Sequence, residues 1–271
     1  MCVAGCETKV RAALSRRGFF KGAAAAGFAA TAVPARASDA RSFTKVVDLT
    51  HTMSAEFPTF MGKPGIEMQR EFDFKKDRFN LFWWHVIEHA GTHLDAPIHF
   101  SEAGLSADQL PIEQLVVPLA VVNVVYQAEQ DADYQLSRAD LVKWEAEHGR
   151  LPAGCCVALH SGWGELATAD PARFAGRDVN GTFHFPGFAP AAAIWLMKER
   201  HVAGIAVDTM SLDHGPSREF RTHQLWLPSG RWGLENVANL DKVPEVGATL
   251  VVGASKVKDS TGGLARVIAL V

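Results

Sequence analysis

Residues 89–99 read His-Ala-Gly-Thr-His-Leu-Asp-Ala-Pro-Ile-His, with three histidines and one aspartate, all at odd positions. In an extended chain, side chains of equal parity share a face, so His93 and Asp95 are expected to point the same way. A turn at Gly91 would bring His89 beside them. Two imidazoles and a carboxylate form a facial set that suits Zn²⁺, Mn²⁺ or Fe²⁺ with positions open for water. The stretch therefore predicts a metal site on strand and turn.

The last histidine of this stretch has a different expected role. His99 follows Pro97, whose fixed φ bends the chain away from the preceding direction. His99 could therefore face water on the metal without being a ligand itself.

A second pattern overlaps the first. Residues 85–89 (His-Val-Ile-Glu-His) match the inverted zinc-protease pattern H-x-x-E-H, which requires a helix. The aromatic and β-branched residues before it, and Gly91 and Pro97 after it, favour a strand followed by a turn. On a strand, Glu88 would face away from both histidines, so the peptidase interpretation is rejected.

Composition restricts the class of protein. The chain has 271 residues, of which 48% are hydrophobic and 21% charged, as in ordinary soluble proteins. Disordered, collagen-like and coiled-coil chains are excluded, and one large domain is the simplest expectation. The net charge of −3 predicts no nucleic-acid partner. No apolar run reaches the ~20 residues that span a bilayer, so no membrane partner is predicted.

Strands are predicted to outnumber helices. Helices are expected over 137–149, with Ser137 as N-cap and Gly149 as the stop, and over 190–201. Residues 170–186 are expected to form a long surface loop near the site. No glycine fingerprint opens a helix, which disfavours a doubly wound sheet. Apolar or alternating segments predict strands at 44–50, 66–74, 81–87, 115–126, 155–160, 204–208, 248–252 and 264–270.

The first 37 residues resemble a twin-arginine (Tat) signal peptide. Arg16 and Arg17 precede an Ala-rich run over 22–33, and residues 34–37 (Pro-Ala-Arg-Ala) offer a small-x-small cleavage site. We therefore expect residues 1–37 to be removed on export, leaving a periplasmic domain of residues 38–271. An Ala-rich N-terminal helix or a membrane anchor is the alternative interpretation.

The motif over 89–99 resembles the signature of the metal-dependent cyclase family, which includes kynurenine formamidases (arylformamidases) and isatin hydrolases. Further segments carry the resemblance from about residue 44 to the end: 48–51, 207–213, 262–267, and His223 followed twelve residues later by Glu235. The resemblance implies an α/β fold, a strand-rich single domain of the swivelling β/β/α type. It also implies assembly as a homodimer or homotetramer.

The resemblance also implies a set of metal ligands. By this comparison His89, His93 and Asp95 would bind a first ion. In members with two ions, Asp95 would bridge to a second, held also by His223 and Glu235. Zinc and manganese both occur in the family, so one or two divalent ions per chain are expected.

The implied activity is a metal-dependent hydrolysis of a C–N amide bond in an aryl formamide or a cyclic aryl amide. Hydroxide formed from water on the ion would attack the carbonyl, and His99 would serve as the acid/base. Asp208 and Asp213 could orient the imidazoles or could be turn carboxylates. A lactone or ester hydrolase is one alternative. A non-catalytic periplasmic binding protein is another, although such a protein has no use for a proton-transferring His99.

Aromatic residues cluster in sequence before the metal motif. Phe57, Phe60, Trp83 and Trp84 are predicted to line a pocket for a flat aromatic substrate. The predicted partner is thus a small aromatic amide, such as N-formylkynurenine or isatin.

Overall fold

A computed structural model describes residues 42–271, and Phe43–Val271 form one compact unit. The predicted signal peptide and its cleavage site lie outside the described residues. Between residues 42 and 271, no helix has both the length and the apolar character needed to cross a membrane.

Seven strands close into a barrel. Their order around the ring is β12-β11-β5-β7-β9-β10-β4 and back to β12, while β1 (Val46–Asp48) pairs on the outside of β12. The four strands from β5 to β10 run parallel, and the other pairings are antiparallel. The ring consists of β4 (His93–Asp95), β5 (Val116–Asn123), β7 (Cys156–His160), β9 (Gly204–Val207), β10 (Trp232–Glu235), β11 (Thr249–Ala254) and β12 (Gly262–Leu270). This strand-rich α/β fold confirms the predicted class.

The long strand β12 closes the ring. Its first three residues pair with β4, and the following residues pair with β11. At the seam, a Cβ on Gly262 would clash with the carbonyl oxygen of Leu94 and lie 2.7 Å from Cε1 of His89. Glycine is therefore required where two strands and a site histidine approach this closely.

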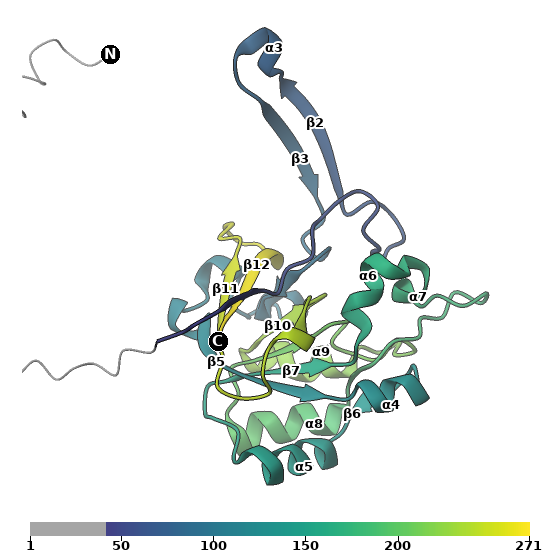
Figure 1. The fold of residues 1–271 in the computed structure, drawn as a ribbon, viewed down its shortest axis with the longest axis vertical. Helices are drawn as coiled ribbons and strands as arrows, with labels where there is room; N and C mark the ends of the chain where they lie inside the picture. Colours follow the sequence, from purple (N-terminus) through teal and green to yellow (C-terminus); the bar gives the residue numbers. More distant parts are fainter. Residues whose placement is uncertain (1–41) are drawn as a thin grey trace, which may run out of the picture. The chain divides into compact units, whose positions relative to one another are not determined.

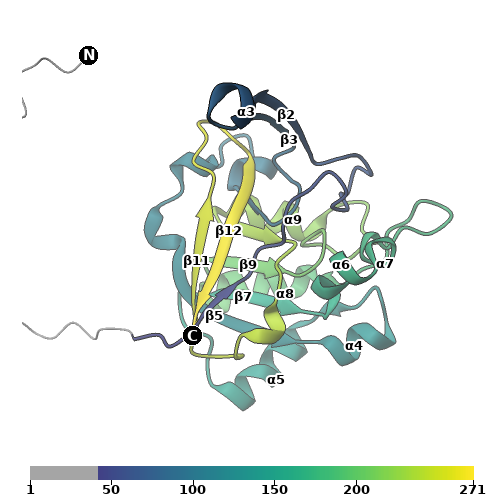
Figure 2. The same cartoon turned by 45° about the horizontal axis from the view of Figure 1, so that its top comes forward.

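Helices cover the barrel on the outside. Figure 1 places α5 (Arg138–His148) and α8 (Pro190–Trp195) beside each other next to β5 and β7. Buried side chains such as Trp144, Leu159 and Trp226 fill the layer between strands and helices, whereas Leu94, Leu234 and Val267 belong to a separate apolar cluster inside the ring. The remaining helices are α4 (Val125–Gln130), α6 (Leu166–Ala169), α7 (Pro171–Ala175) and α9 (Arg221–Trp226). Figure 2 shows the barrel strands and α4–α8 from a second direction.

Most predicted elements are present. The helix after Ser137 begins with a capping box to Asp140 and ends at Gly149. The predicted helix over 190–201 continues α8 as a π-helical turn over Leu196–Arg200. The predicted surface loop over 170–186 contains one short helix, α7, at its start, with the Asp170 side chain capping that helix.

A hairpin projects from the barrel (Figure 1). It consists of β2 (Ile66–Phe72) and β3 (Leu81–Val86), with the short helix α3 (Phe74–Asp77) at its tip. In the described chain these two strands pair only with each other. A further small pairing joins β6 (Gln135–Leu136) to β8 (Gly187–Phe188).

Candidate metal centre

Strand β4 carries two of the predicted ligands on one face. Leu94 is fully buried in the barrel core, so its neighbours His93 and Asp95 point to the opposite face, as the parity of the motif predicts. In the antiparallel register, His93 lies directly opposite Glu235 on β10. Residues directly opposite each other share a face, so Glu235 joins the same group.

Four buried side chains meet at this face. Nε2 of His93 lies 3.2 Å from Oδ1 of Asp95 and 3.3 Å from Oε2 of Glu235. Nε2 of His223 lies 3.1 Å from Oε1 of Glu235 and 3.5 Å from Oδ2 of Asp95. Nε2 of His93 and Oδ2 of Asp95 are buried without a hydrogen-bond partner in the described chain. Burying such atoms unpaired is costly, so this donor set fits a cation between them.

The electrostatics of the group point the same way. Burial alone would lower the pKa of His93, but Asp95 and Glu235 outweigh it and raise the pKa to about 10. Burial likewise opposes charge on His223, yet bonds to Asp213, Asp95 and Glu235 raise its pKa well above the usual value. Both site carboxyls, Asp95 and Glu235, keep a lowered pKa despite their burial, because the histidines stabilise the carboxylates. The group therefore requires positive charge, which a divalent ion supplies while releasing protons.

A carboxylate behind His223 fixes the direction of its ring. Nδ1 of His223 bonds Oδ2 of Asp213 at 2.7 Å, and Asp213 also accepts from the backbone N–H groups of Thr222 and His223. This leaves Nε2 aimed at Asp95 and Glu235, as expected of an imidazole prepared for a metal. Asp213 is thus the orienting carboxylate.

The other candidate for that role, Asp208, holds a turn instead. It accepts from the backbone N–H of Ser161 at 2.9 Å and from its hydroxyl at 2.6 Å. Burial raises the pKa of Asp208, while these hydrogen bonds oppose the shift. Its role is therefore to join the ends of β7 and β9.

His89 reaches the group through the turn after β3. Its Nδ1 lies 2.7 Å from Oδ1 of Asp95, and its Nε2 lies 2.8 Å from Oγ1 of Thr261. Gly91 makes this possible with a φ of 60°. The Thr261 hydroxyl also donates to Glu88. Glu88 and His89 therefore share the Thr261 hydroxyl, and the expectation for Glu88 on a strand does not apply, because β3 ends at Val86.

His99 lies on a short 3₁₀ helix, η1 (Pro97–Phe100), which starts at the predicted bend. Its ring stacks on His89, with centroids 3.8 Å apart and planes at 21°. Burial lowers the pKa of His99 to about 4, so the ring is neutral near pH 7. A neutral imidazole beside the cluster can accept a proton.

The six predicted residues gather around Asp95. One set that could hold an ion is His93, Asp95 and Glu235, and another is His89, Asp95 and His99. In each set the ligand atoms lie within 4.8 Å of one another, and Asp95 belongs to both. The grouping differs from the expected one, since His93 pairs with Glu235 across the strands and His99 is close enough to be a ligand.

Aromatic rings flank the cluster, but they are only partly the predicted ones. Phe100 and Phe220 lie 4.9 and 5.9 Å from the His223 ring, and Phe60 lies 5.9 Å from Phe220. Phe60 therefore lies near the cluster through its contact with Phe220. Phe220 has a φ of 50°, a strained conformation for a bulky residue, at the N-terminal end of α9.

The other three predicted pocket residues lie elsewhere. Phe57 is buried against His51 and Phe174, with ring centroids 5.4 and 5.8 Å away, and it belongs to an apolar cluster. Trp83 and Trp84 lie on the projecting hairpin and are 59% and 61% exposed. Sequence proximity to the motif misled the prediction here, because the chain leaves the barrel between residues 66 and 86.

Sequence reasoning missed two of the flanking rings. Phe100 follows His99 directly, and Phe220 precedes His223 by three residues. Adjacency to a predicted ligand was the only available signal, and strand and helix geometry decides which neighbours matter.

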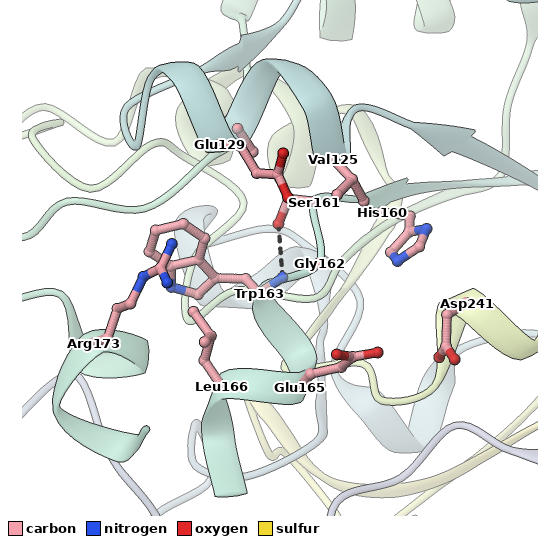
Figure 3. A pocket seen from close by; sticks show the side chains of 11 residues that line it. Val125, Glu129, His160, Ser161, Gly162, Trp163, Glu165, Leu166, Arg173 and Asp241 are labelled. Carbon is pink, nitrogen blue, oxygen red and sulfur yellow. Dashed lines mark hydrogen bonds between the residues drawn. The ribbon is translucent and has the colours of Figure 1, made fainter. Parts of the chain in front are cut away.

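A cavity of about 320 Å³ lies elsewhere, where β7 ends (Figure 3). Its wall includes His160, Trp163, Glu165 and Asp241, and none of the predicted site residues lines it. The Ser161 hydroxyl accepts from the backbone N–H of Trp163 and stabilises the turn at its edge. The candidate metal centre is therefore separate from this cavity.

Fold and site together define a strand barrel with a buried histidine–carboxylate cluster suited to divalent metal. Residues 47–214 match the model of the Cyclase family, described as "Putative cyclase". The match covers more than half of the chain, which belongs to this family.

Individual relatives agree with the family. Isatin hydrolase from Roseibium aggregatum is 32% identical over 84% of this chain and 92% of the relative. Kynurenine formamidase from Paracidovorax citrulli is 27% identical over 58% of this chain and 64% of the relative. The solved structure of isatin hydrolase A from Ralstonia solanacearum superposes with a TM-score of 0.78 at 32% identity, covering 84% of this chain and 92% of that one.

A further solved structure is an isatin hydrolase bound to the product analogue thioisatinate. It has a TM-score of 0.77 at 30% identity, again over 84% of this chain and 92% of that one.

Proposed function

We propose that this chain is a metal-dependent hydrolase that cleaves the C–N amide bond of an aryl formamide or a cyclic aryl amide. One observation carries the proposal. In the candidate metal centre beside β4 and β10, Nε2 of His93 and Oδ2 of Asp95 are buried without hydrogen-bond partners in the described chain. The similarity to isatin hydrolase and kynurenine formamidase supports the substrate class.

The metal ligands in this proposal are His89, His93, Asp95, His223 and Glu235. A divalent ion, Zn²⁺ or Mn²⁺, would supply activated water and polarise the amide carbonyl. Asp95 is the shared member of both candidate sets, which favours a bridging role if two ions bind.

His99 is the proposed acid/base. Burial holds its pKa at about 4, so it is unprotonated at the start of the reaction and can take a proton from water. It can then return that proton to the leaving nitrogen. Stacking on His89 keeps its ring beside the cluster. Such proton transfer typically contributes about 10² to 10⁴ in rate.

The substrate's aromatic ring is proposed to lie against the rings beside His223. Phe100 and Phe220 flank that imidazole, and Phe60 extends the aromatic surface. Ring stacking orients a flat substrate and excludes water from the reacting carbonyl.

The decisive experiment is a substrate screen on protein loaded with a defined metal. We expect Zn²⁺- or Mn²⁺-loaded protein to hydrolyse isatin, N-formylkynurenine or formanilide, and EDTA treatment to abolish the activity. Matched esters and lactones should be turned over more slowly than the amides. Activity that survives complete removal of metal would refute the proposal, and a preference for esters would redirect it to a lactone or ester hydrolase.

Export by the twin-arginine route to the periplasm is proposed from Arg16 and Arg17. Replacing both by Lys should retain the protein in the cytoplasm of a bacterial host, whereas the unchanged chain should appear in the periplasm with residues 1–37 removed. Equal distribution of the two would contradict export by this route.

A further inference from the structure

Glu88 is the glutamate of the H-x-x-E-H pattern, and neither set of side chains that could hold an ion within residues 42–271 includes it. The residue is half-buried and lies between the end of β3 and the turn at Gly91. Its Oε2 accepts hydrogen bonds from both the hydroxyl and the backbone N–H of Thr261, which directly precedes β12. The Glu88 carboxylate therefore connects the segment before the metal motif to the strand that closes the barrel.

The contacts of Thr261 give a chain of hydrogen bonds its direction. A hydroxyl has one proton to donate, and a carboxylate oxygen accepts, so the Thr261 proton points to Glu88. Nε2 of His89 lies 2.8 Å from the same hydroxyl oxygen. Because the proton of that hydroxyl is already used, its oxygen accepts from the imidazole. Nε2 of His89 is therefore a nitrogen that carries a proton.

A proton on Nε2 leaves Nδ1 of His89 as the nitrogen that faces the candidate metal centre. Nδ1 lies 2.7 Å from Oδ1 of Asp95, which belongs to both sets that could hold an ion. Turning the ring over would place carbon atoms against Asp95 and Thr261 and lose both hydrogen bonds. The ring is also held by packing, since His99 stacks on its face and a Cβ on Gly262 would lie 2.7 Å from its Cε1.

We propose that Glu88 and Thr261 are positioning residues that fix the tautomer of His89, so that this histidine binds a metal ion through Nδ1. The inference rests on the metal-binding role of His89 in the proposed function. A carboxylate hydrogen-bonded to the far nitrogen of a metal-binding imidazole orients the ring and makes it a stronger ligand. Here the Thr261 hydroxyl lies between the carboxylate and the imidazole and transmits that effect.

The other two histidines of the centre have the opposite arrangement. Nδ1 of His93 lies 2.9 Å from the carbonyl oxygen of Gly91, and Nδ1 of His223 lies 2.7 Å from Oδ2 of Asp213. Both therefore leave Nε2 for an ion, whereas His89 leaves Nδ1. Each of the three imidazoles thus has its own acceptor, and the acceptor for His89 is Thr261.

The first measurement is the affinity of the full chain for Zn²⁺, by competition with a chromogenic chelator. Thr261→Val removes the acceptor for Nε2 and should weaken zinc binding by about 10- to 100-fold, and Thr261→Ser should restore most of the affinity. Glu88→Leu should also weaken binding, because the freed Thr261 proton can then bond Nε2 and favour a proton on Nδ1. The matched control is Ser255→Ala, which removes an exposed hydroxyl bonded to the Leu264 carbonyl and should leave the affinity unchanged.

A double variant separates positioning from a general loss of structure. Because Glu88 acts through Thr261, Glu88→Leu/Thr261→Val should bind zinc no more weakly than Thr261→Val alone. Losses that add in the double variant would contradict the proposal, as would an unchanged affinity in Thr261→Val. Far-UV circular dichroism checks that each variant is folded.

A third measurement, on the unchanged chain, observes the binding nitrogen directly by nuclear magnetic resonance. With ¹¹³Cd²⁺ as the ion and ¹⁵N-labelled histidine, scalar coupling to the metal should appear at Nδ1 of His89, and His89→Asn identifies that signal by its loss. Coupling at Nε2 of His89, or at neither of its nitrogens, would overturn this inference alone. A chain that binds neither zinc nor cadmium would overturn the proposed function and this inference with it.

Discussion

His93 and Glu235 face each other across the β4–β10 pairing, and Nε2 of His93 lies 3.3 Å from Oε2 of Glu235 although 142 residues separate them in sequence. The same imidazole lies 3.2 Å from Asp95, two residues away. The candidate centre thus combines a local motif with a carboxylate that only the closed barrel brings into place.

Replacing Asp213 by Asn should weaken metal binding without unfolding the protein. Asp213 accepts from Nδ1 of His223 at 2.7 Å and so sets which nitrogen faces Glu235. An amide can present its N–H to that nitrogen and favour the wrong tautomer. The expected loss of metal affinity is about 10- to 100-fold, measured by competition with a chromogenic chelator. Asp208→Asn, beside Ser161, is the control, and an equal loss there would contradict a specific role for Asp213.

Replacing His99 by Ala should separate catalysis from metal binding, if His99 acts only as the acid/base. We expect kcat to fall by about 10² to 10⁴ while the metal content measured by elemental analysis stays unchanged. His93→Ala should lose both activity and bound metal. Loss of metal in His99→Ala would instead assign His99 to the ligand set with His89 and Asp95, which the short distances in that set permit.

Two adjacent glycines at the barrel seam should respond differently to alanine. A Cβ on Gly262 would clash with the Leu94 carbonyl oxygen and press on His89, whereas a Cβ on Gly263 would meet its nearest neighbour, Ser255, at an ordinary 3.4 Å. Gly262→Ala should therefore lower the free energy of unfolding by several kcal/mol, roughly the effect of the most severe single substitutions. It should also lower the metal content. Gly263→Ala should be close to neutral. Thermal unfolding measures the stability of both variants. Similar melting temperatures would show that the barrel can accommodate a Cβ at position 262.

A half-buried histidine outside the centre should make stability depend on pH. Burial lowers the pKa of His51 to about 4 from its usual 6.5. Between these values the unfolded chain binds more protons, so the free energy of unfolding rises with pH. The contribution is fully present above pH 6.5 and is lost as the pH falls towards 4, by at most about 3 kcal/mol.

Urea unfolding at several pH values tests this contribution. His51→Gln should flatten the acid side of the stability curve, whereas His85→Gln, at an exposed position on β3, should leave it unchanged. An unaltered curve for the His51 variant would show that other groups cause the acid loss.

The sequence predicted the features that depend on contacts between residues close in the chain better than those that depend on distant contacts. The parity of His93 and Asp95, the turn at Gly91 and the cap at Ser137 are local, and all were predictable. Glu235 was identified only through the family resemblance, because the pairing of β4 with β10 has no local signal. Trp83 and Trp84 were misplaced for a related reason, since an apolar strand pattern does not reveal whether the strand enters the barrel or leaves it.

The closure of β12 onto β4 also determines whether folding or metal uptake comes first. Glu235 and His223 reach Asp95 only in the finished ring, so the unfolded chain offers an ion little more than the fragment around residues 89–95. Any ion held by the whole set is therefore taken up by a protein that has already folded. The ions available where the finished ring first meets them would then determine which metal the protein carries.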